Sequence, residues 1–434
     1  MQKKMTYRIV ALVLTALVGL SACRKHADET SSATRYSDIP ILFDCQGGVE
    51  VATRADDDFY ISNEQLITGQ YFAVNAWNTG AGYLSTNPGA PAFMTQLPVQ
   101  YQNNRDKGKN NTYTPVVSGV GKNMNDWMDQ FWPRDGSAYR YSFCAYYPYD
   151  ANSSVTGISA PTFPTSTVGQ YAFTAKSSVE DMVDFCVSDV ANDQVYGHTT
   201  SDYAGTVKLN FHHALTRVRV KFLKASDVSD ATAIELLDAQ LLNVKTEGTL
   251  TATYAQYEDP SDPGVPAPGP DRVGTTSLAW SGVDTQVDYQ IRVRGVDPDP
   301  DATPDPVRIL LPKTMELLPD DVFLMVPQDI VEPDPGDLHD PENPDADAQA
   351  ILFKWTIDHN YAEPKTTLLY LSESVKHPGD PTPADVSWGV GDSVTYTVVI
   401  HATPIHFADA GVEVLVSVAR WPDEDVNGYI QIID

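Results

Sequence analysis

Basic residues are scarce in this sequence, which carries 29 Lys and Arg against 58 Asp and Glu, for a formal net charge of −29 at pH 7. A chain of this charge repels the phosphate backbone of nucleic acids and the anionic headgroups of lipid bilayers. The composition therefore predicts a protein without a nucleic-acid partner, and it argues against membrane binding that is driven by charge.

Motifs of the common enzyme classes are also absent. The sequence has no zinc-protease helix motif, no nucleophile elbow, no phosphate-binding glycine loop and no paired CxxC. Its nine histidines are scattered, and among 58 acidic residues no single carboxylate pair stands out as a glycosidase site. We therefore predict a protein that is not an enzyme, with no catalytic residue and no cofactor.

The sequence also gives little indication of a metal site. Asp423, Asp425 and Asn427 stand at the first, third and fifth positions of a calcium-loop template, but strands flank the segment, and an Asn-Gly pair between alternating runs favours a tight turn. The adjacent His212 and His213 also suggest a metal site, yet neighbouring side chains of a strand point to opposite faces. We predict no metal site, with Asp423, Asp425 and Asn427 as the weak candidate.

The apolar run near the N-terminus, residues 9–20, is too short to span a bilayer comfortably. Three basic residues precede it within the first eight positions, which is the layout of a secretory signal. The run leads into Leu20-Ser21-Ala22-Cys23, which resembles a bacterial lipobox, where a signal peptide is cleaved and the cysteine is lipidated. We therefore expect a signal peptide at 1–22 and a mature chain that starts at lipidated Cys23 and continues as a polar tether.

Only four cysteines occur, and Cys45, Cys144 and Cys186 are those that remain after Cys23 in an exported chain. An odd number leaves one thiol unpaired. If the segment that carries Cys45 is removed, Cys144 and Cys186 become an even pair that a disulfide would join. Two buried free thiols are the alternative, because nothing in the sequence places these two residues on adjacent strands.

Residues 39–54 predict a strand that ends at a protease site. The apolar residues alternate on either side of a Gly-Gly pair, as in a half-buried strand, and the run closes on Arg54, which precedes Ala55 and three aspartates. A cut between Arg54 and Ala55 would release a hydrophobic strand, Ile41 to Val51, and leave a groove in the sheet that only another strand can fill. The alternative is an ordinary first strand followed by a surface loop.

Strand patterns dominate most of the chain, so we expect an all-β fold. A length of 434 residues is too great for one core, and the polar segment 227–232 separates a predicted N-terminal domain, 55–228, from a C-terminal domain, 229–434. Residues 207–222 are expected to form one strand with a bulge, whereas 234–249 fit a helix and a strand equally well. The Pro- and Asp-rich inserts are predicted to be loops: 258–271, 297–306, 332–347 and 376–385.

Aromatic residues are dense between 131 and 149, and residues 139–149 predict a strand that Pro148 stops. Such density usually fills a hydrophobic core. A platform on which sugar rings stack is the alternative interpretation, because aromatic faces also bind carbohydrate.

Taken together, these residues resemble the fimbrillins, the pilins and pilin-like lipoproteins of type V pili in anaerobic Gram-negative bacteria. The most specific stretches are Trp132-Pro133 followed by 141–148 (YSFCAYYP), then 207–218 (VKLNFHHALTRV) and 241–249 (LLNVKTEGT). The lipobox, the arginine after the first strand and the alternating C-terminus complete the likeness, which covers most of the chain. In this family the last stretch is strand and turn, so the resemblance favours β-structure for 234–249.

The resemblance implies two tandem β-sandwich domains of the transthyretin-like type, in a lipoprotein that is sent to the outer membrane. In the family an arginine-specific protease removes the first strand, which places the cut after Arg54 here and makes 23–54 the lipidated tether plus the removable strand. The vacated groove would accept the C-terminal strands of a neighbouring subunit. The candidate donor residues are Val412, Val414, Val416, Val418, Tyr429, Ile430 and Ile432.

The function implied is that of a structural subunit of a cell-surface type V pilus, or fimbrium, which assembles by donor-strand exchange and serves adhesion. Its partners would be other pilin subunits, the outer membrane through the lipid anchor, and a receptor or glycan on a host or bacterial surface. The alternative function is a non-polymerising outer-membrane lipoprotein that acts as a pilus anchor, a tip adhesin or a glycan-binding module.

Overall fold

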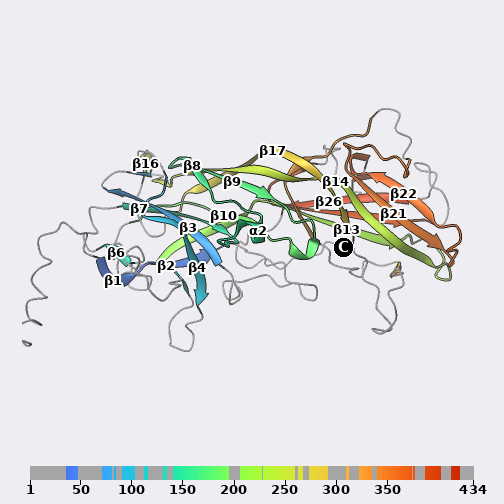
Figure 1. Ribbon diagram of the computed structural model, residues 1–434, viewed down its shortest axis with the longest axis horizontal. Helices are drawn as coiled ribbons and strands as arrows, with labels where there is room; N and C mark the ends of the chain where they lie inside the picture. The colour runs from blue at the N-terminus through green and yellow to red at the C-terminus, as the bar shows by residue number, and fades with distance from the viewer. Residues whose placement is uncertain are drawn as a thin grey trace, which may run out of the picture.

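The computed structural model describes residues 36–46, 71–80, 83–84, 90–102, 112–115, 131–133, 140–194, 206–226, 228–259, 262–266, 273–291, 309–311, 322–334, 340–373, 375–376, 387–401 and 412–420. Within these residues the chain is almost entirely β-structure, with one helical turn, α2 (Ser153–Thr156), and two 3-10 turns, η5 (Val179–Asp181) and η6 (Leu371–Glu373). Figure 1 shows an elongated molecule with the early strands at one end and the late strands at the other. The prediction of a mostly β protein is confirmed.

Eight strands from the first part of the chain form one sheet, in the order β10-β12-β2-β5-β4-β3-β7-β11. Because β10 pairs with β7 as well as with β12, the pairings close a ring of seven strands: β10, β12, β2, β5, β4, β3 and β7. Every strand of a closed ring is held from both sides. The bounds are β2 (Leu42–Gln46), β3 (Tyr71–Gly80), β4 (Met94–Gln102), β5 (Thr112–Pro115), β7 (Arg140–Tyr147), β10 (Cys186–Ser188), β11 (Ala191–Gln194) and β12 (Thr206–His213).

Alternate residues of the ring strands face two different cores, as the two-residue period of a strand requires. Phe72 of β3 and Phe143 of β7 belong to a core that we call the ring core, whereas Trp77 and Tyr146 of the same strands belong to a larger second core. The ring core includes Ile41, Phe43, Phe72, Phe143, Cys186 and Phe211.

Two long strands connect the ends of the molecule. β14 (Ile234–Ala255) pairs with β21 (Ala350–Ile357) over its first part and with β9 (Val168–Thr174) over its second part. β17 (Thr275–Gln290) runs antiparallel to β14, and Figure 1 shows both strands crossing the middle of the molecule. Residues 234–249 are therefore strand, as the resemblance indicated.

A five-stranded sheet lies at the end of the molecule that holds the late strands. Its order is β19 (Val322–Met325), β13 (Thr216–Lys224), β25 (Asp392–Ile400), β26 (Val412–Arg420) and β23 (Val375–Lys376). β13 pairs with β19 and β25 across the predicted boundary at 228/229, and the ring of Phe222 lies 5.3 Å from that of Phe353. The division into domains 55–228 and 229–434 stays a prediction.

The expectation of one bulged strand over 207–222 is wrong. The structure has two strands there, β12 and β13, which belong to different sheets. The chain changes sheets at Ala214 and Leu215, whose backbone groups bind elsewhere: Ala214 N–H donates to Phe185 O at 2.8 Å, and Leu215 O accepts from Gly391 N at 3.0 Å. Trp280 Nε1 donates to Ala214 O at 2.8 Å, so both backbone groups of Ala214 and the carbonyl of Leu215 keep a partner at the crossover.

The remaining strands are short. Their pairs are β1 (Tyr36–Pro40) with β6 (Phe131–Pro133), β8 (Thr162–Thr165) with β9, β22 (Lys365–Tyr370) with β21, β18 (Ile309–Leu310) with β14, β20 (Gln328–Asp329) with β24 (Ser387–Trp388), and β15 (Glu258–Asp259) with β16 (Asp262–Pro266). Of these, β8, β22 and β18 extend the sheet that contains β14, and the others form separate two-stranded sheets. The β15–β16 ribbon corrects the expectation that 258–271 is entirely loop. A two-stranded ribbon tolerates prolines because half of its backbone N–H groups need no partner strand.

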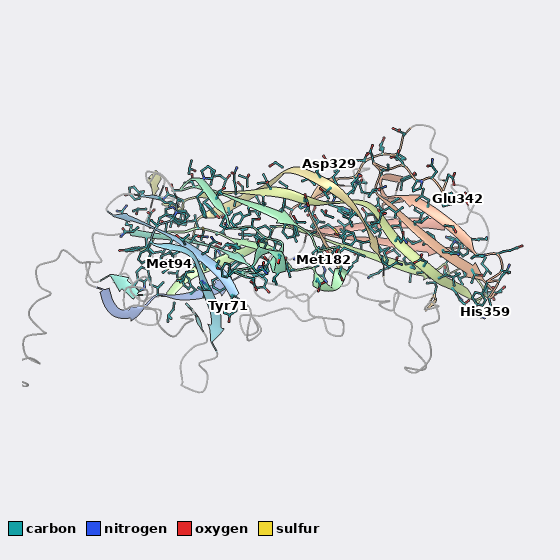
Figure 2. The ribbon with its side chains drawn as sticks, viewed as in Figure 1. Tyr71, Met94, Met182, Asp329, Glu342 and His359 are labelled. Carbon is teal, nitrogen blue, oxygen red and sulfur yellow. The ribbon has the colours of Figure 1, made fainter. Side chains whose placement is uncertain are left out.

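Side chains fill the molecule from end to end (Figure 2). Tyr71 and Met94 mark the end that holds the ring, His359 marks the opposite end, and Met182 lies between them. Met182 is buried in the second core, and its sulfur accepts the backbone N–H of Leu324 at 3.3 Å. The region between the two ends is therefore packed.

Candidate functional site at strand β2

The strand predicted to be removable occupies an internal position in the ring. β2 pairs in parallel with β12 over five residue pairs, from Thr206↔Leu42 to Asn210↔Gln46, and antiparallel with β5 at Phe43↔Tyr113. Both of its edges are therefore covered by strands that come from later in the chain. If β2 left, β12 and β5 would each present an unpaired edge to a new strand.

The side chains of this segment alternate as the sequence predicts. Ile41 and Phe43 have no exposed surface, while Leu42 between them is half-buried. The ring of Phe43 meets Phe143 edge-on, with ring centroids 6.0 Å apart, and it contacts Phe72 in the same way. Phe43 is thus one of the side chains that fill the interior of the ring.

The neighbour β12 is held on its other side by a short strand. β10 pairs with β12 over three residue pairs, Cys186↔His213, Val187↔His212 and Ser188↔Phe211. A backbone bond from Asp189 N to Asn210 O, 2.7 Å long, extends the contact by one step. β12 forms one side of the β2 position. On its other side it is attached to β10 through these three residue pairs and this one further hydrogen bond.

The two histidines at the end of β12 face different acids, as predicted for neighbours on a strand. His212 Nε2 lies 2.9 Å from Asp189 Oδ2, and His213 Nδ1 lies 2.8 Å from Asp184 Oδ2. The first pair is partly exposed on the His212 side, whereas the second is fully buried. Cys186 lies beside the second pair, a grouping that sequence analysis missed because the residues come from different strands.

Cys144 and Cys186 are both free and buried. Cys144 belongs to the second core and Cys186 to the ring core, so their thiols lie on opposite faces of the sheet. A disulfide between them does not form in this structure. Burial raises the pKa of the Cys144 thiol to about 12, which keeps it protonated and unreactive at neutral pH.

Five of the aromatic residues in the 131–149 segment are core residues. Trp132, Tyr141, Phe143, Tyr146 and Tyr147 each expose 4% of their surface or less. All of these except Tyr147 pack against another aromatic ring, and the ring centroids of Trp132 and Phe143 lie 5.9 Å apart. These side chains are therefore not available for stacking against sugar rings.

The predicted donor segment lies in the chain's own sheet over the part that is described. β26 pairs antiparallel with β25 over nine residue pairs, from Val412↔Ile400 to Arg420↔Asp392, and parallel with β23 over two. Val416 of β26 is buried with 4% of its surface exposed. The prediction that Val412, Val414, Val416 and Val418 serve a neighbouring subunit stays a prediction.

Several other predicted residues lie outside the described part of the chain. They are Cys23, Arg54 and Ala55, the remaining donor candidates Tyr429, Ile430 and Ile432, and the weak calcium candidates Asp423, Asp425 and Asn427. Among the described residues, no helix has the length and apolar character needed to cross a membrane.

Comparison with known proteins gives one family match. A family profile described as fimbrillin-like matches residues 53–421. No curated protein matches the chain.

Several solved structures are similar to this chain at low sequence identity. A fimbrial protein from Bacteroides vulgatus is 14% identical, with 81% of this chain and 93% of that chain covered and a TM-score of 0.41. The fimbrilin FimA of Porphyromonas gingivalis is 10% identical, with coverages of 89% and 98% and a TM-score of 0.34. The tip fimbrial protein Mfa3 of Porphyromonas gingivalis, with a C-terminal truncation, is 11% identical, with coverages of 81% and 100% and a TM-score of 0.30.

Proposed function

This chain belongs to the fimbrillin-like family, a structural and adhesive family without enzymatic activity, and on that premise we propose that it is a subunit of a type V pilus. In this proposal it is exported as a lipoprotein, anchored at the outer membrane through Cys23 and displayed at the cell surface. Its architecture is that of two tandem transthyretin-like β-sandwich domains, and its partners are other pilin subunits.

Assembly in this proposal begins with a protease cut between Arg54 and Ala55. The cut removes β2, and the C-terminal strands of a neighbouring subunit, 412–418 and 429–433, fill the position that it leaves. The observation that carries the proposal is the place of β2 as an internal strand, paired on both edges and with Phe43 in the ring core.

Physical chemistry explains why an emptied β2 position must be refilled. Ile41 and Phe43 are fully buried, and each such side chain contributes roughly 1.5 to 3 kcal/mol by leaving water. A replacement strand with alternating valines recovers such burial and satisfies the two exposed backbone edges. Because donor and acceptor surfaces differ, head-to-tail exchange propagates into a filament and does not close into a dimer.

A second candidate is favoured by the pairing of β26. Its nine residue pairs with β25 place it as an integral strand of its own subunit, which suits a lipoprotein that does not donate a strand. Such a protein would act as a pilus anchor or a tip adhesin, with a receptor or glycan as its partner.

N-terminal sequencing of protein sheared from the cell surface separates the two functions. A mature chain that starts at Ala55 supports the polymerising subunit, because only a cut chain has an open β2 position. Intact chains that all start at Cys23 would overturn assembly by strand exchange and favour the anchor or adhesin.

A further inference from the structure

Asp184, Cys186 and His213 meet at the junction of β10 and β12. Cys186 is the first residue of β10, Asp184 precedes it by two positions, and His213 is the last residue of β12 and stands directly opposite Cys186 in the register. All three residues are buried, with 2%, 0% and 3% of their surface exposed. The three side chains offer an oxygen, a sulfur and a nitrogen, which are the usual protein ligands of zinc.

The distances between the ligand atoms suit one small cation. His213 Nδ1 lies 2.8 Å from Asp184 Oδ2, Cys186 Sγ lies 3.2 Å from the same oxygen, and Cys186 Sγ lies 3.6 Å from His213 Nδ1. Ligand atoms around a tetrahedral zinc ion are roughly 3.3 to 3.6 Å apart, given metal–ligand bonds of about 2.0 to 2.3 Å. To reach this geometry the nitrogen–oxygen edge has to lengthen by about 0.5 Å and the sulfur–oxygen edge by about 0.1 to 0.4 Å, while the sulfur–nitrogen edge already fits.

A second observation concerns the other oxygen of the same carboxylate. Asp184 Oδ1 is buried and has no hydrogen-bond partner. The thiol and the imidazole of the cluster both lie against Oδ2 instead. A buried carboxylate oxygen without a donor is costly, and a cation that both oxygens of Asp184 approach would satisfy it.

Charge and ligand softness indicate which cation fits. A thiolate and a carboxylate together carry two negative charges, and a divalent ion with a neutral imidazole makes the buried cluster electrically neutral. A thiolate ligand favours zinc over calcium and magnesium, which prefer sites made entirely of oxygen atoms.

We propose that Asp184, Cys186 and His213 form a binding site for a thiophilic divalent cation, Zn²⁺, which ties β10 to β12. Binding releases the thiol proton to solvent and leaves the imidazole proton on Nε2, so that Sγ, Nδ1 and the Asp184 carboxylate all face the ion. The site is independent of pilus assembly, since it needs neither a cut at Arg54 nor a second subunit.

Cobalt substitution of the uncut chain, without its signal peptide, tests the site. The protein is stripped of metal with a chelator, and Co²⁺ or Zn²⁺ is then added in stoichiometric steps. We expect one tightly bound Zn²⁺ per chain, a rise in melting temperature with zinc, and a thiolate-to-Co²⁺ charge-transfer absorption band. Wild-type protein without this band, or without a metal-dependent rise in melting temperature, would overturn the proposal.

Two pairs of matched variants assign the ligands. Cys186→Ser and His213→Gln should weaken zinc binding by more than the roughly 10- to 100-fold that even an outer-shell change costs. Cys144→Ser and His212→Gln are the controls, because they change the same residue types on other faces, and they should retain the site. A charge-transfer band that survives in Cys186→Ser would assign the metal to another thiol and overturn the site; if that variant does not fold, His213→Gln against His212→Gln decides.

Discussion

The rings of Phe43 and Phe72 meet edge to face, with centroids 6.3 Å apart and planes at 86°. Phe43 lies on β2 and Phe72 on β3, and β5 and β4 separate these strands in the sheet. The contact therefore crosses the interior of the ring instead of joining neighbouring strands. It attaches the strand whose removal we propose to the part of the wall that would remain.

Replacement of this ring should destabilise only the uncut chain. We expect Phe43→Ala to lower the free energy of unfolding by about 3 to 5 kcal/mol, the usual cost of a cavity where a buried phenylalanine stood. Denaturant unfolding of the uncut protein measures this loss. Leu42→Ala, at a half-buried neighbouring position, is the control and should cost clearly less, and equal losses would contradict the alternation of the strand.

The same variant also reports on the fate of β2. If the segment is removed by a cut after Arg54, Phe43 leaves with it. The cut Phe43→Ala protein should then have the same melting temperature as the cut wild-type protein. A cut protein that stays destabilised by Phe43→Ala would indicate that the segment remains bound in its groove.

Arg54→Gln should abolish maturation and assembly together. An arginine-specific protease does not cut after glutamine, so the surface protein should begin at Cys23 and run as a monomer in size-exclusion chromatography. Arg105→Gln removes an arginine elsewhere in the chain and serves as the control, and we expect it to give the same mature start at Ala55 that we expect of the wild type. Polymer formation by Arg54→Gln protein would show that exchange does not need this cut.

The local pattern of the sequence predicted the strands themselves well. Period-two alternation identified Ile41 and Phe43 as buried, and the strand expected over 139–149 is β7, which ends before Pro148. Both inferences depend only on neighbours along the chain, because alternation and the missing proline N–H are local properties.

The same pattern could not predict which strands pair with each other. The run 207–222 alternates almost throughout, yet its two parts join different sheets at Ala214 and Leu215. Likewise Cys186 and His213 are 27 positions apart, and only the β10–β12 register brings them together. A two-residue period tells which side of a strand faces inward, but not which strand lies beside it.

The acidic insert at 332–347 should respond to acid through one carboxylate. Asp345 Oδ2 accepts the backbone N–H of Asp334 and Oδ1 accepts that of Asp347, each at 2.8 Å, and these bonds hold the pKa of Asp345 below its ordinary value of 3.8. A carboxylate with a lowered pKa stabilises the fold above its unfolded-state pKa, and this contribution is lost as the pH falls through the folded-state pKa. Asp345→Asn should therefore flatten the acid side of the melting curve against pH.

The control for this carboxylate is Asp334→Asn, which retains the backbone N–H that Asp345 accepts. Melting temperatures of the two variants and the wild type are compared from neutral pH to well below 3.8. Equal acid slopes for wild type and Asp345→Asn would show that these bonds do not contribute to stability.

The last prediction distinguishes two roles of the C-terminal residues: donation of a strand to a neighbouring subunit, or pairing within the sheet of their own subunit. If residues 429–433 fill the groove of a neighbour, deletion of Tyr429 to Asp434 should leave the melting temperature of the uncut monomer unchanged while it weakens polymerisation of the cut protein. Val416→Asp is the contrasting variant, because it places a charge at a buried position of β26. It should destabilise the monomer by roughly 3 to 5 kcal/mol. A deletion that lowers the monomer's melting temperature as much as Val416→Asp would mean that 429–434 complete their own sheet, and strand donation by this segment would then have to be abandoned.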